Sequence, residues 1–264
     1  MRSSRPSPFH LVFFLLGALM LLFVVAPLVR ITLDTSTSEL ADAIHDSELW
    51  GSIAMTLRAA GIATLISVLF GIPLAYLLAH HRFPGRSLVL GIIDIPIMIP
   101  HSAAGLALLT VIGRYSLAQK AARPLGIEFV GEEAGIAVAM AFVSVPFLVN
   151  AAREGFESVP VRLEKVARTL GATPARVFVT ISLPLAWRAI VSGMVLMWAR
   201  GISEFGAVII IAYHPMATPV LVFQRFNDYG LPYARVAAVI LILVCVVGFG
   251  VLRFLSRPAQ RETG

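Results

Sequence analysis

The 264-residue sequence has little charge and almost no cysteine. Charged residues make up 14% of the chain, whereas hydrophobic residues make up 58%. An ordinary soluble fold could not bury so much apolar surface, so a soluble protein is excluded and several segments must lie in lipid. The single cysteine, Cys245, lies in an apolar run. An internal disulfide is therefore excluded, and we expect no metal site.

The sequence also lacks a nucleotide-binding motif. No G-x-x-x-x-G-K-[ST] phosphate loop is present, so the chain does not bind a nucleotide by that route. The formal net charge of +6 would suggest nucleic acid as the partner of a soluble protein. Here the basic residues cluster in short loops at the ends of apolar runs, as orientation in a membrane requires. We therefore expect no nucleic-acid partner and no catalytic residue.

Six apolar segments are each about 20 residues long, the length needed to cross a hydrocarbon core of about 30 Å. The first follows Arg2 and Arg5 but has Ala26-Pro27 in place of a small-x-small cleavage site, so we interpret it as a retained helix rather than a signal peptide. The sequence predicts an all-α integral membrane protein with six transmembrane helices, at approximately 9–31, 55–79, 88–112, 134–150, 190–213 and 236–255.

The charges of the loops predict the topology of these six helices. The acidic segment 34–48 opens one side, and no Lys or Arg occurs between Ile31 and Trp50. The basic loops on the other side mark the cytoplasm, so both termini are predicted to lie there, in a chain that forms one multi-pass membrane domain over residues 1–264. The basic residues of that side are Arg2, Arg5, Arg82, Arg86, those between Arg153 and Arg188, Arg253, Arg257 and Arg261.

A polar-rich loop at about residues 150–189 separates the fourth and fifth segments. Four residues recur at i, i+3, i+4 and i+7 and share one face of a short amphipathic helix: Leu163, Val166, Ala167 and Leu170. The remaining faces carry Arg162, Glu164, Lys165 and Arg168.

A second short helix is predicted to follow the first. Gly171 suits the left-handed position that ends the first helix, and Thr173-Pro174 suits the cap and first turn of the second, which Leu183-Pro184 would close. The hairpin could dock on another protein, or it could merely tie two spans together.

The spacing within this loop is distinctive. Gly171, nine residues and then Ile181-x-Leu183-Pro184 match in spacing the E-A-A-x-x-x-G-x9-I-x-L-P pattern of permease subunits of binding-protein-dependent ABC importers, which the loop resembles. Lys165 and Val166 stand where the pattern has Glu and the first Ala, and a Glu occurs one place earlier, at Glu164.

This resemblance implies a type I ABC importer permease fold in a prokaryotic cytoplasmic (inner) membrane, with the hairpin as a coupling helix seated on a cytoplasmic ABC ATPase dimer. The chain itself would hold no cofactor, since ATP and Mg would be bound by the ATPase. The implied ATPase-coupling residues are Arg162, Leu163, Glu164, Lys165, Ala167, Arg168, Leu170 and Gly171.

Two further runs resemble one branch of this family, the molybdate and tungstate permeases. Residues 94–109 resemble the D-x-P-x-x-I-P-H-x-x-A-G-x-A-L-L run of that branch, and residues 199–215 resemble its A-R-G-I-S-E-F-G-A-V segment with the short Y-x-P turn that follows. The resemblance implies translocation of molybdate or tungstate delivered by an extracytoplasmic binding protein, through a pair of identical chains. Sulfate permeases share the architecture and the loop, so a sulfate-type oxyanion permease is the alternative.

The third segment has features of a helix that lines a pathway. Pro96 and Pro100 each remove a backbone donor, so a kinked helix is predicted, and residues 102–105 are small enough for another helix or an ion to approach closely. The same small residues would equally permit tight helix packing. With the resemblance, the candidates for the translocation pathway are Pro100, His101, Ser102, Gly105, Ser203 and Glu204.

Arg200 and Glu204 lie four residues apart within the fifth apolar segment. Each isolated charge would cost about 2.5 to 3.5 kcal/mol at the centre of a membrane, so we expect the two to form an ion pair. The pair could line a pathway, or it could lock two spans together.

Two other function classes fit a chain of this composition. A secondary transporter driven by an ion gradient would be expected to contain an inverted repeat, and we find none between the two halves. A non-transporting membrane scaffold would leave oxyanion uptake unchanged when it is removed.

Overall fold

The computed structural model describes residues 8–255 of the chain and the side chains of residues 9–250. Within these residues all regular structure is helical, without a strand. The elements in chain order are α1 (Pro8–Leu33), α2 (Thr37–Ile44), α3 (Ser47–His80), α4 (Arg86–Met98), α5 (His101–Ile112), α6 (Leu117–Ala122), η1 (Arg123–Leu125), α7 (Glu133–Glu157), α8 (Val161–Thr169), α9 (Pro174–Val177), η2 (Phe178–Ser182), α10 (Leu183–Ile202), α11 (Gly206–Ile211), α12 (Thr218–Tyr229) and α13 (Leu231–Leu255).

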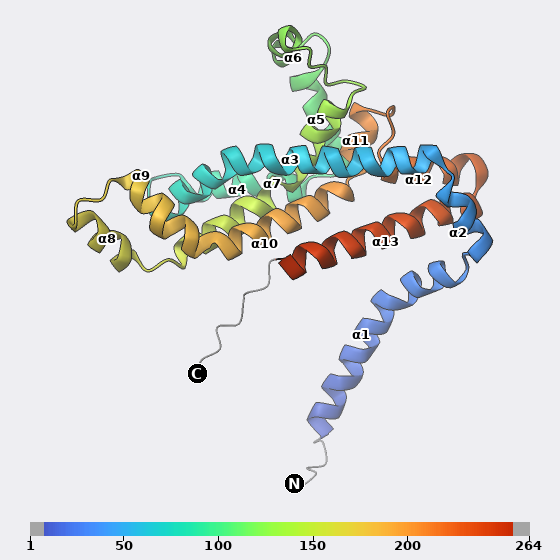
Figure 1. Cartoon of the computed structure of the whole chain (residues 1–264), viewed down its shortest axis with the longest axis horizontal. Helices are drawn as coiled ribbons and strands as arrows, with labels where there is room; N and C mark the ends of the chain where they lie inside the picture. Colours follow the sequence, from blue (N-terminus) through green and yellow to red (C-terminus); the bar gives the residue numbers. More distant parts are fainter. Residues whose placement is uncertain (1–7, 256–264) are drawn as a thin grey trace.

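Helices α3, α7 and α10 form the centre of the molecule (Figure 1). Small residues allow their backbones to approach closely, as is common between membrane helices. A Cβ atom added at Gly193 of α10 would lie 2.8 Å from Ala151 Cβ of α7, and one added at Gly155 of α7 would lie 2.6 Å from Ala189 Cβ of α10. Hydrophobic side chains such as Met140 and Ile190 fill the rest of this interface and are fully buried.

Five helical stretches of the described residues are long and apolar enough to cross a membrane, and the bent pair α4 and α5 makes six if it is one span. The predicted number of six spans is therefore reached only if α4 and α5 are counted as one span. Arg2, Arg5, Arg257 and Arg261, on which the predicted orientation of the termini depends, lie outside the described residues, as does the side chain of Arg253.

The third predicted span is broken rather than kinked. The chain bends by 114° between α4 and α5. Ile99 has the extended conformation (φ −81°, ψ 148°) that a residue before proline prefers, and Pro100 lacks the amide hydrogen that would continue the helix. In Figure 1, α5 and α6 consequently project from the layer that contains α3, α7 and α10.

The fifth predicted span, 190–213, has the wrong limits. The apolar helix runs from Pro174 to Ile202 and ends before Glu204, while α11 is a separate short helix. The predicted end of the second hairpin helix at Leu183-Pro184 is also wrong, because α9 continues through the π-helical turn η2 into α10. The π turn interrupts the regular hydrogen-bond ladder just before Pro184, which has no amide hydrogen to donate.

The two ends of the helical layer carry different structures (Figure 1). The hairpin of α8 and α9 lies at one end, and α2 and α12 lie at the other. Helix α1 leans away from the layer, and almost all of its described side chains are exposed. The hairpin and the acidic segment 34–48 thus lie at opposite ends, as the loop charges predict.

Ion pairs to two arginines, here called the arginine clasp, hold the acidic segment 34–48 against the end of the layer. Arg225 of α12 contacts Asp46 at 2.7 Å and Glu48 at 2.9 Å, and Arg235 of α13 contacts Glu39 at 3.1 Å. Burial opposes the ionisation of Asp46, but hydrogen bonds from Arg225 and from the amide of Leu49 outweigh it and hold the pKa of this carboxyl below its usual value. The clasp is therefore intact at neutral pH and weakens only as the pH falls through that lowered pKa.

Gly105 is buried where α5 packs against α11. A Cβ atom at this position would lie 3.0 Å from both the Cα and the carbonyl oxygen of Ala207 and 3.1 Å from the Cβ of Ile210. We expect Gly105→Ala to lower the free energy of unfolding by about 1 to 3 kcal/mol, because backbone atoms cannot give way as a flexible side chain would. Thermal unfolding of the purified protein measures this.

The matched control for this substitution is Gly61→Ala in α3, where no atom lies within 4 Å of the added Cβ. Alanine favours the helix by up to about 1 kcal/mol over glycine, so this variant should be as stable as the original protein or slightly more so. Equal melting temperatures for the two variants would contradict the close packing of α5 on α11.

Candidate functional site

The hairpin of α8 and α9 forms from local sequence signals. Gly171 has a φ of 87°, a left-handed conformation that favours glycine, and it ends α8 as predicted. The Thr173 hydroxyl accepts a hydrogen bond from the amide of Arg176, and Pro174 occupies the first turn of α9. The turn therefore holds α8 across the end of the layer.

Most side chains of α8 face away from the protein. Leu163 and Val166 are 46% and 49% exposed, and Leu170 at its end is 83% exposed. Arg162, Lys165 and Arg168 are also exposed, and Ala167 is half-buried. An exposed apolar face rimmed by cations is typical of a surface that another protein covers.

Glu164 differs from the other polar residues of α8, because it points into the protein. Only 5% of the residue is exposed. Its carboxylate accepts a hydrogen bond of 2.5 Å from the Ser182 hydroxyl and lies 3.0 and 3.1 Å from Nε2 of His80. Glu164 therefore does not belong to the exposed face that a partner would contact.

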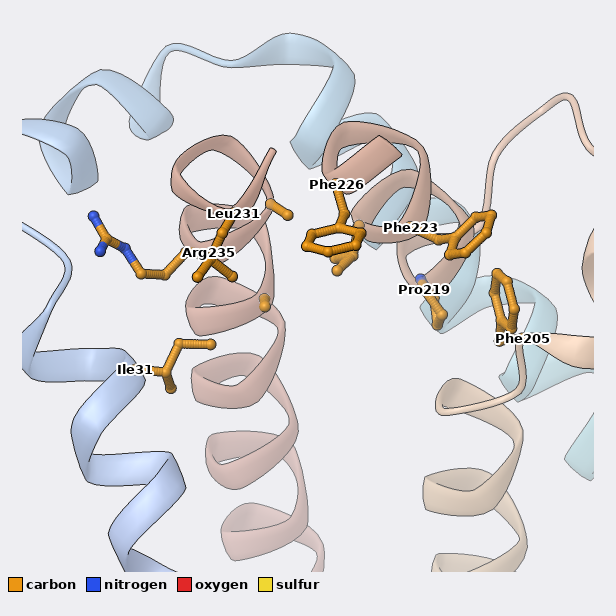
Figure 2. A pocket seen from close by; sticks show the side chains of 10 residues that line it. Ile31, Phe205, Pro219, Phe223, Phe226, Leu231 and Arg235 are labelled. Carbon is orange, nitrogen blue, oxygen red and sulfur yellow. The ribbon is translucent and has the colours of Figure 1, made fainter. Parts of the chain in front are cut away.

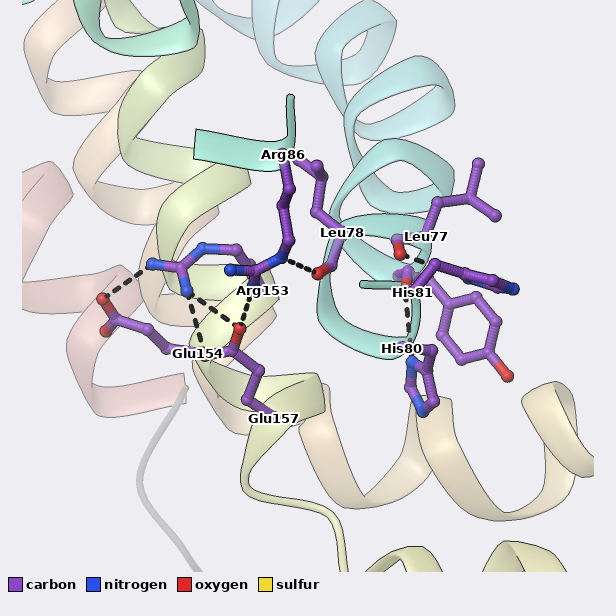
Figure 3. Close-up of polar contacts among 9 residues, drawn as sticks. Leu77, Leu78, His80, His81, Arg86, Arg153, Glu154 and Glu157 are labelled. Atoms are coloured by element: carbon purple, nitrogen blue, oxygen red, sulfur yellow. Dashed lines mark hydrogen bonds and ion pairs between the residues drawn. The ribbon is translucent and has the colours of Figure 1, made fainter. Parts of the chain in front are cut away.

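Charged residues also join α3, α4 and α7 close to the hairpin (Figure 3). Arg86, at the start of α4, donates to the carbonyl oxygen of Leu78 at 2.8 Å and to Glu157 of α7 at 2.6 Å. Arg153 of α7 donates to the same carboxylate at 2.9 Å. These contacts fix the loop after α3 at the end of the layer that carries the hairpin.

A second polar cluster lies between the break after α4 and the break after α10. Arg200 lies 2.9 Å from Glu204, and Nε2 of His101 lies 2.7 Å from the same guanidinium nitrogen. Glu204 also accepts a hydrogen bond of 2.9 Å from the amide of Ala207 at the start of α11. The side chain of Glu204 is completely buried, whereas those of Arg200 and His101 are 23% and 40% exposed. Arg200 and Glu204 thus form the expected ion pair, and this pair lies where α4 and α10 end.

The ring of His101 lies beside both members of the ion pair. A guanidinium group only donates, and the ring nitrogen nearest to Arg200 is Nε2, at 2.7 Å. Nδ1 lies 3.4 Å from the same guanidinium nitrogen and 3.7 Å from Glu204. His101 therefore contacts the paired arginine and glutamate from one side.

The other pathway candidates lie in different surroundings. Pro100, Ser102 and Ser203 are exposed, and the Ser203 hydroxyl lies 3.3 Å from Arg200. Gly105 is buried against α11, so packing explains its small size.

Two further polar contacts between the helices have no signal in the sequence. Asn150 of α7 donates to Asp94 of α4 at 2.7 Å, and Glu133 of α7 pairs with Arg58 of α3 at 2.9 Å. Each joins residues more than 50 positions apart, so local periodicity could not reveal the pairing.

An apolar groove of about 350 Å³ lies beyond the Glu204 cluster (Figure 2). Phe205, the residue after Glu204, packs against Phe223 of α12 with ring centroids 4.9 Å apart and the ring planes tilted by 53°. Ile31 of α1 faces Leu231 and Arg235 of α13 across the other part of the groove. The groove therefore begins one residue after Glu204, at Phe205, and extends between α1, α12 and α13.

Known proteins with similar sequences are transport permeases. The chain is 42% identical to the molybdate/tungstate transport system permease protein of Pyrococcus abyssi over 247 residues, which cover 93% of this chain and 94% of that protein. It is 32% identical to the sulfate transport system permease protein of Salmonella typhimurium, over 93% of this chain and 91% of that protein.

The fold agrees with these relatives. A bacterial alginate ABC transporter, solved in complex with an alginate pentasaccharide-bound periplasmic protein, contains a chain that matches with a TM-score of 0.73 at 16% identity, covering 94% of each chain. The expected type I ABC importer permease fold is therefore confirmed. Residues 71–260 match the family described as "Binding-protein-dependent transport system inner membrane component". Because this match covers more than half of the sequence, the chain belongs to that family of inner membrane transport components.

Proposed function

We propose that this chain is the permease subunit of an ATP-driven importer of molybdate or tungstate. The observation that carries the proposal is the 42% identity, over 93% of the chain, to a molybdate/tungstate permease protein. The sulfate permease protein is similar over the same share of the chain but at 32% identity. Sulfate is therefore the second candidate substrate.

The partners are inferred from the exposed face of α8 and from the lack of a phosphate loop in the sequence. The exposed apolar face of α8, formed by Leu163, Val166 and Leu170, is the surface on which a cytoplasmic ABC ATPase dimer would sit. That dimer would bind ATP and Mg²⁺, since this sequence contains no phosphate loop. An extracytoplasmic binding protein would deliver the oxyanion to the opposite end. A second copy of the chain would complete the pathway, with both termini in the cytoplasm.

The pathway would pass the breaks after α4 and α10. His101, Arg200 and Ser203 offer partly exposed polar atoms there, and Pro100 and Ser102 lie beside them. Glu204 is completely buried and would act indirectly, by holding Arg200 and His101 in place. A dianion would meet a guanidinium that is already neutralised, so this site would let the anion pass rather than retain it.

In the proposed cycle, ATP binding draws the two ATPases together, and α8 of each permease moves with them. The helices then open toward the loaded binding protein, and hydrolysis returns them to the inward-open state. This chain performs no covalent chemistry in the cycle.

Uptake by cells tests the substrate. We expect cells without this chain to lose uptake of labelled tungstate or molybdate at low external concentration and to keep sulfate uptake, and an ATPase-dead partner should give the same loss. Loss of sulfate uptake alone would move the chain to the second candidate substrate, and unchanged uptake of all three anions would refute the oxyanion function.

A further inference from the structure

The coupling helix α8 is attached to the membrane helices by one buried carboxylate. Glu164 is 5% exposed, and its carboxylate reaches two different elements. Its Oε1 contacts both Ser182, at the end of the π turn η2, and His80, at the end of α3, and its Oε2 contacts His80. Ser182 is itself fully buried. The exposed side chains of α8 make no comparable polar contact with either element within the described residues. Glu164 is therefore the central polar link between α8 and two separate spans.

The hydrogen bonds of His80 connect α8 with α3. Nδ1 lies 3.0 Å from the carbonyl oxygen of Tyr76, one turn earlier in α3. Nε2 lies 3.0 and 3.1 Å from the two carboxylate oxygens of Glu164. Because the Ser182 hydroxyl donates to the same carboxylate at 2.5 Å, Glu164 is held from two sides.

The surroundings make this link stiff. The rings of Tyr76, Phe156 and Phe178 pack against one another with centroids 4.9 to 6.0 Å apart, and the His80 ring lies 4.2 Å from Tyr76. Phe178 begins the π turn and Ser182 ends it, so the turn is held on both sides. Single π turns inside helices frequently occur at functional sites.

We propose that Glu164, His80 and Ser182 form a rigid joint that transmits the movement of α8 to α3 and α10. The three are positioning residues: they contact neither ATP nor the transported anion, and they make ATP hydrolysis productive by keeping α8 fixed to the spans. The proposal rests on the proposed function only in requiring that a partner moves α8.

The ratio of anion uptake to ATP hydrolysis tests the joint in proteoliposomes that contain the complete permease–ATPase complex. We expect Glu164→Ala to lower the tungstate taken up per ATP by about 10-fold, within the range of coupling between distant sites, with hydrolysis largely retained. His80→Ala and Ser182→Ala should lower the same ratio to a smaller extent. The matched control is Glu154→Ala, which removes an exposed carboxylate at the same end of the molecule and should leave the ratio unchanged.

A distance measurement tests the joint independently of which anion is transported. Spin labels are placed at Thr169→Cys in α8 and Leu185→Cys in α10, in a Cys245→Ala background, and the labelled chain is diluted with unlabelled chain so that distances within one copy dominate. The otherwise unchanged protein should then give one narrow distance distribution, and Glu164→Ala should broaden it. Both labelled positions are exposed.

The outcomes are distinguishable. An unchanged distribution in Glu164→Ala, or uptake and hydrolysis that fall in parallel in Glu164→Ala and Ser182→Ala, would overturn the joint. Failure of the unsubstituted complex to transport tungstate, molybdate or sulfate would instead refute the proposed function, while the distance distributions would still decide on the joint.

Discussion

Replacing both Leu163 and Leu170 with aspartate should reduce ATP-driven uptake by at least about 100-fold, because the ATPase would no longer bind. Burying each leucine against a partner is worth about 1.5 to 3 kcal/mol, and placing an unpaired carboxylate there adds a penalty. The permease itself should fold normally, since the two side chains are 46% and 83% exposed. The measurements are co-purification of the ATPase with the permease, and uptake.

The control for this double variant is Leu125→Asp. Leu125 is 76% exposed and lies in η1, away from the hairpin. This variant should retain the ATPase. If the Leu163 and Leu170 variant also bound the ATPase with unchanged affinity, the exposed face of α8 would not be the docking surface, and the hairpin would merely connect two spans.

Glu204→Leu should lower the free energy of unfolding by about 3 to 5 kcal/mol, because it leaves the Arg200 guanidinium without its carboxylate in a buried site. The substitution also removes the acceptor for the amide of Ala207 at the start of α11. Thermal unfolding and uptake should therefore both be strongly affected.

The double variant Arg200→Met with Glu204→Leu decides what the pair does. Replacing both members of a buried ion pair with apolar residues is often neutral or stabilising, so we expect the double variant to regain most of the lost stability. The remaining loss is that of the acceptor for the amide of Ala207. Uptake should remain low if the cluster lines the pathway. Recovery of uptake together with stability would show that the pair only locks the helices.

Local patterns in the sequence predict the parts of this structure that depend on neighbouring residues. The i, i+3, i+4, i+7 spacing predicts α8, and Gly171 and Thr173-Pro174 predict its end and the start of α9. Pro96 and Pro100 predict a disturbance of the third span, but not its size. A proline removes a donor and makes the preceding residue extended, whereas the 114° angle also depends on how α5 packs against α11.

Contacts between residues far apart in the sequence cannot be predicted from such patterns. His80 and Glu164 are 84 positions apart, so a helical pattern places Glu164 among the other polar residues of α8 although its side chain is buried. The end of α10 could not be predicted for another reason. The sequence stays apolar after Glu204, and this continuity suggests one helix. Ser203 and Glu204 within that run are the available signal for the break.

The source of energy for uptake is the measurement that separates the main hypotheses. Proteoliposomes that contain the permease and its ATPase should accumulate labelled tungstate above its external concentration when the loaded binding protein is present outside and ATP with Mg²⁺ inside. A non-hydrolysable ATP analogue should give no accumulation. Accumulation without ATP, driven by an imposed proton or sodium gradient, would contradict an ATP-driven importer and identify the chain as a secondary transporter.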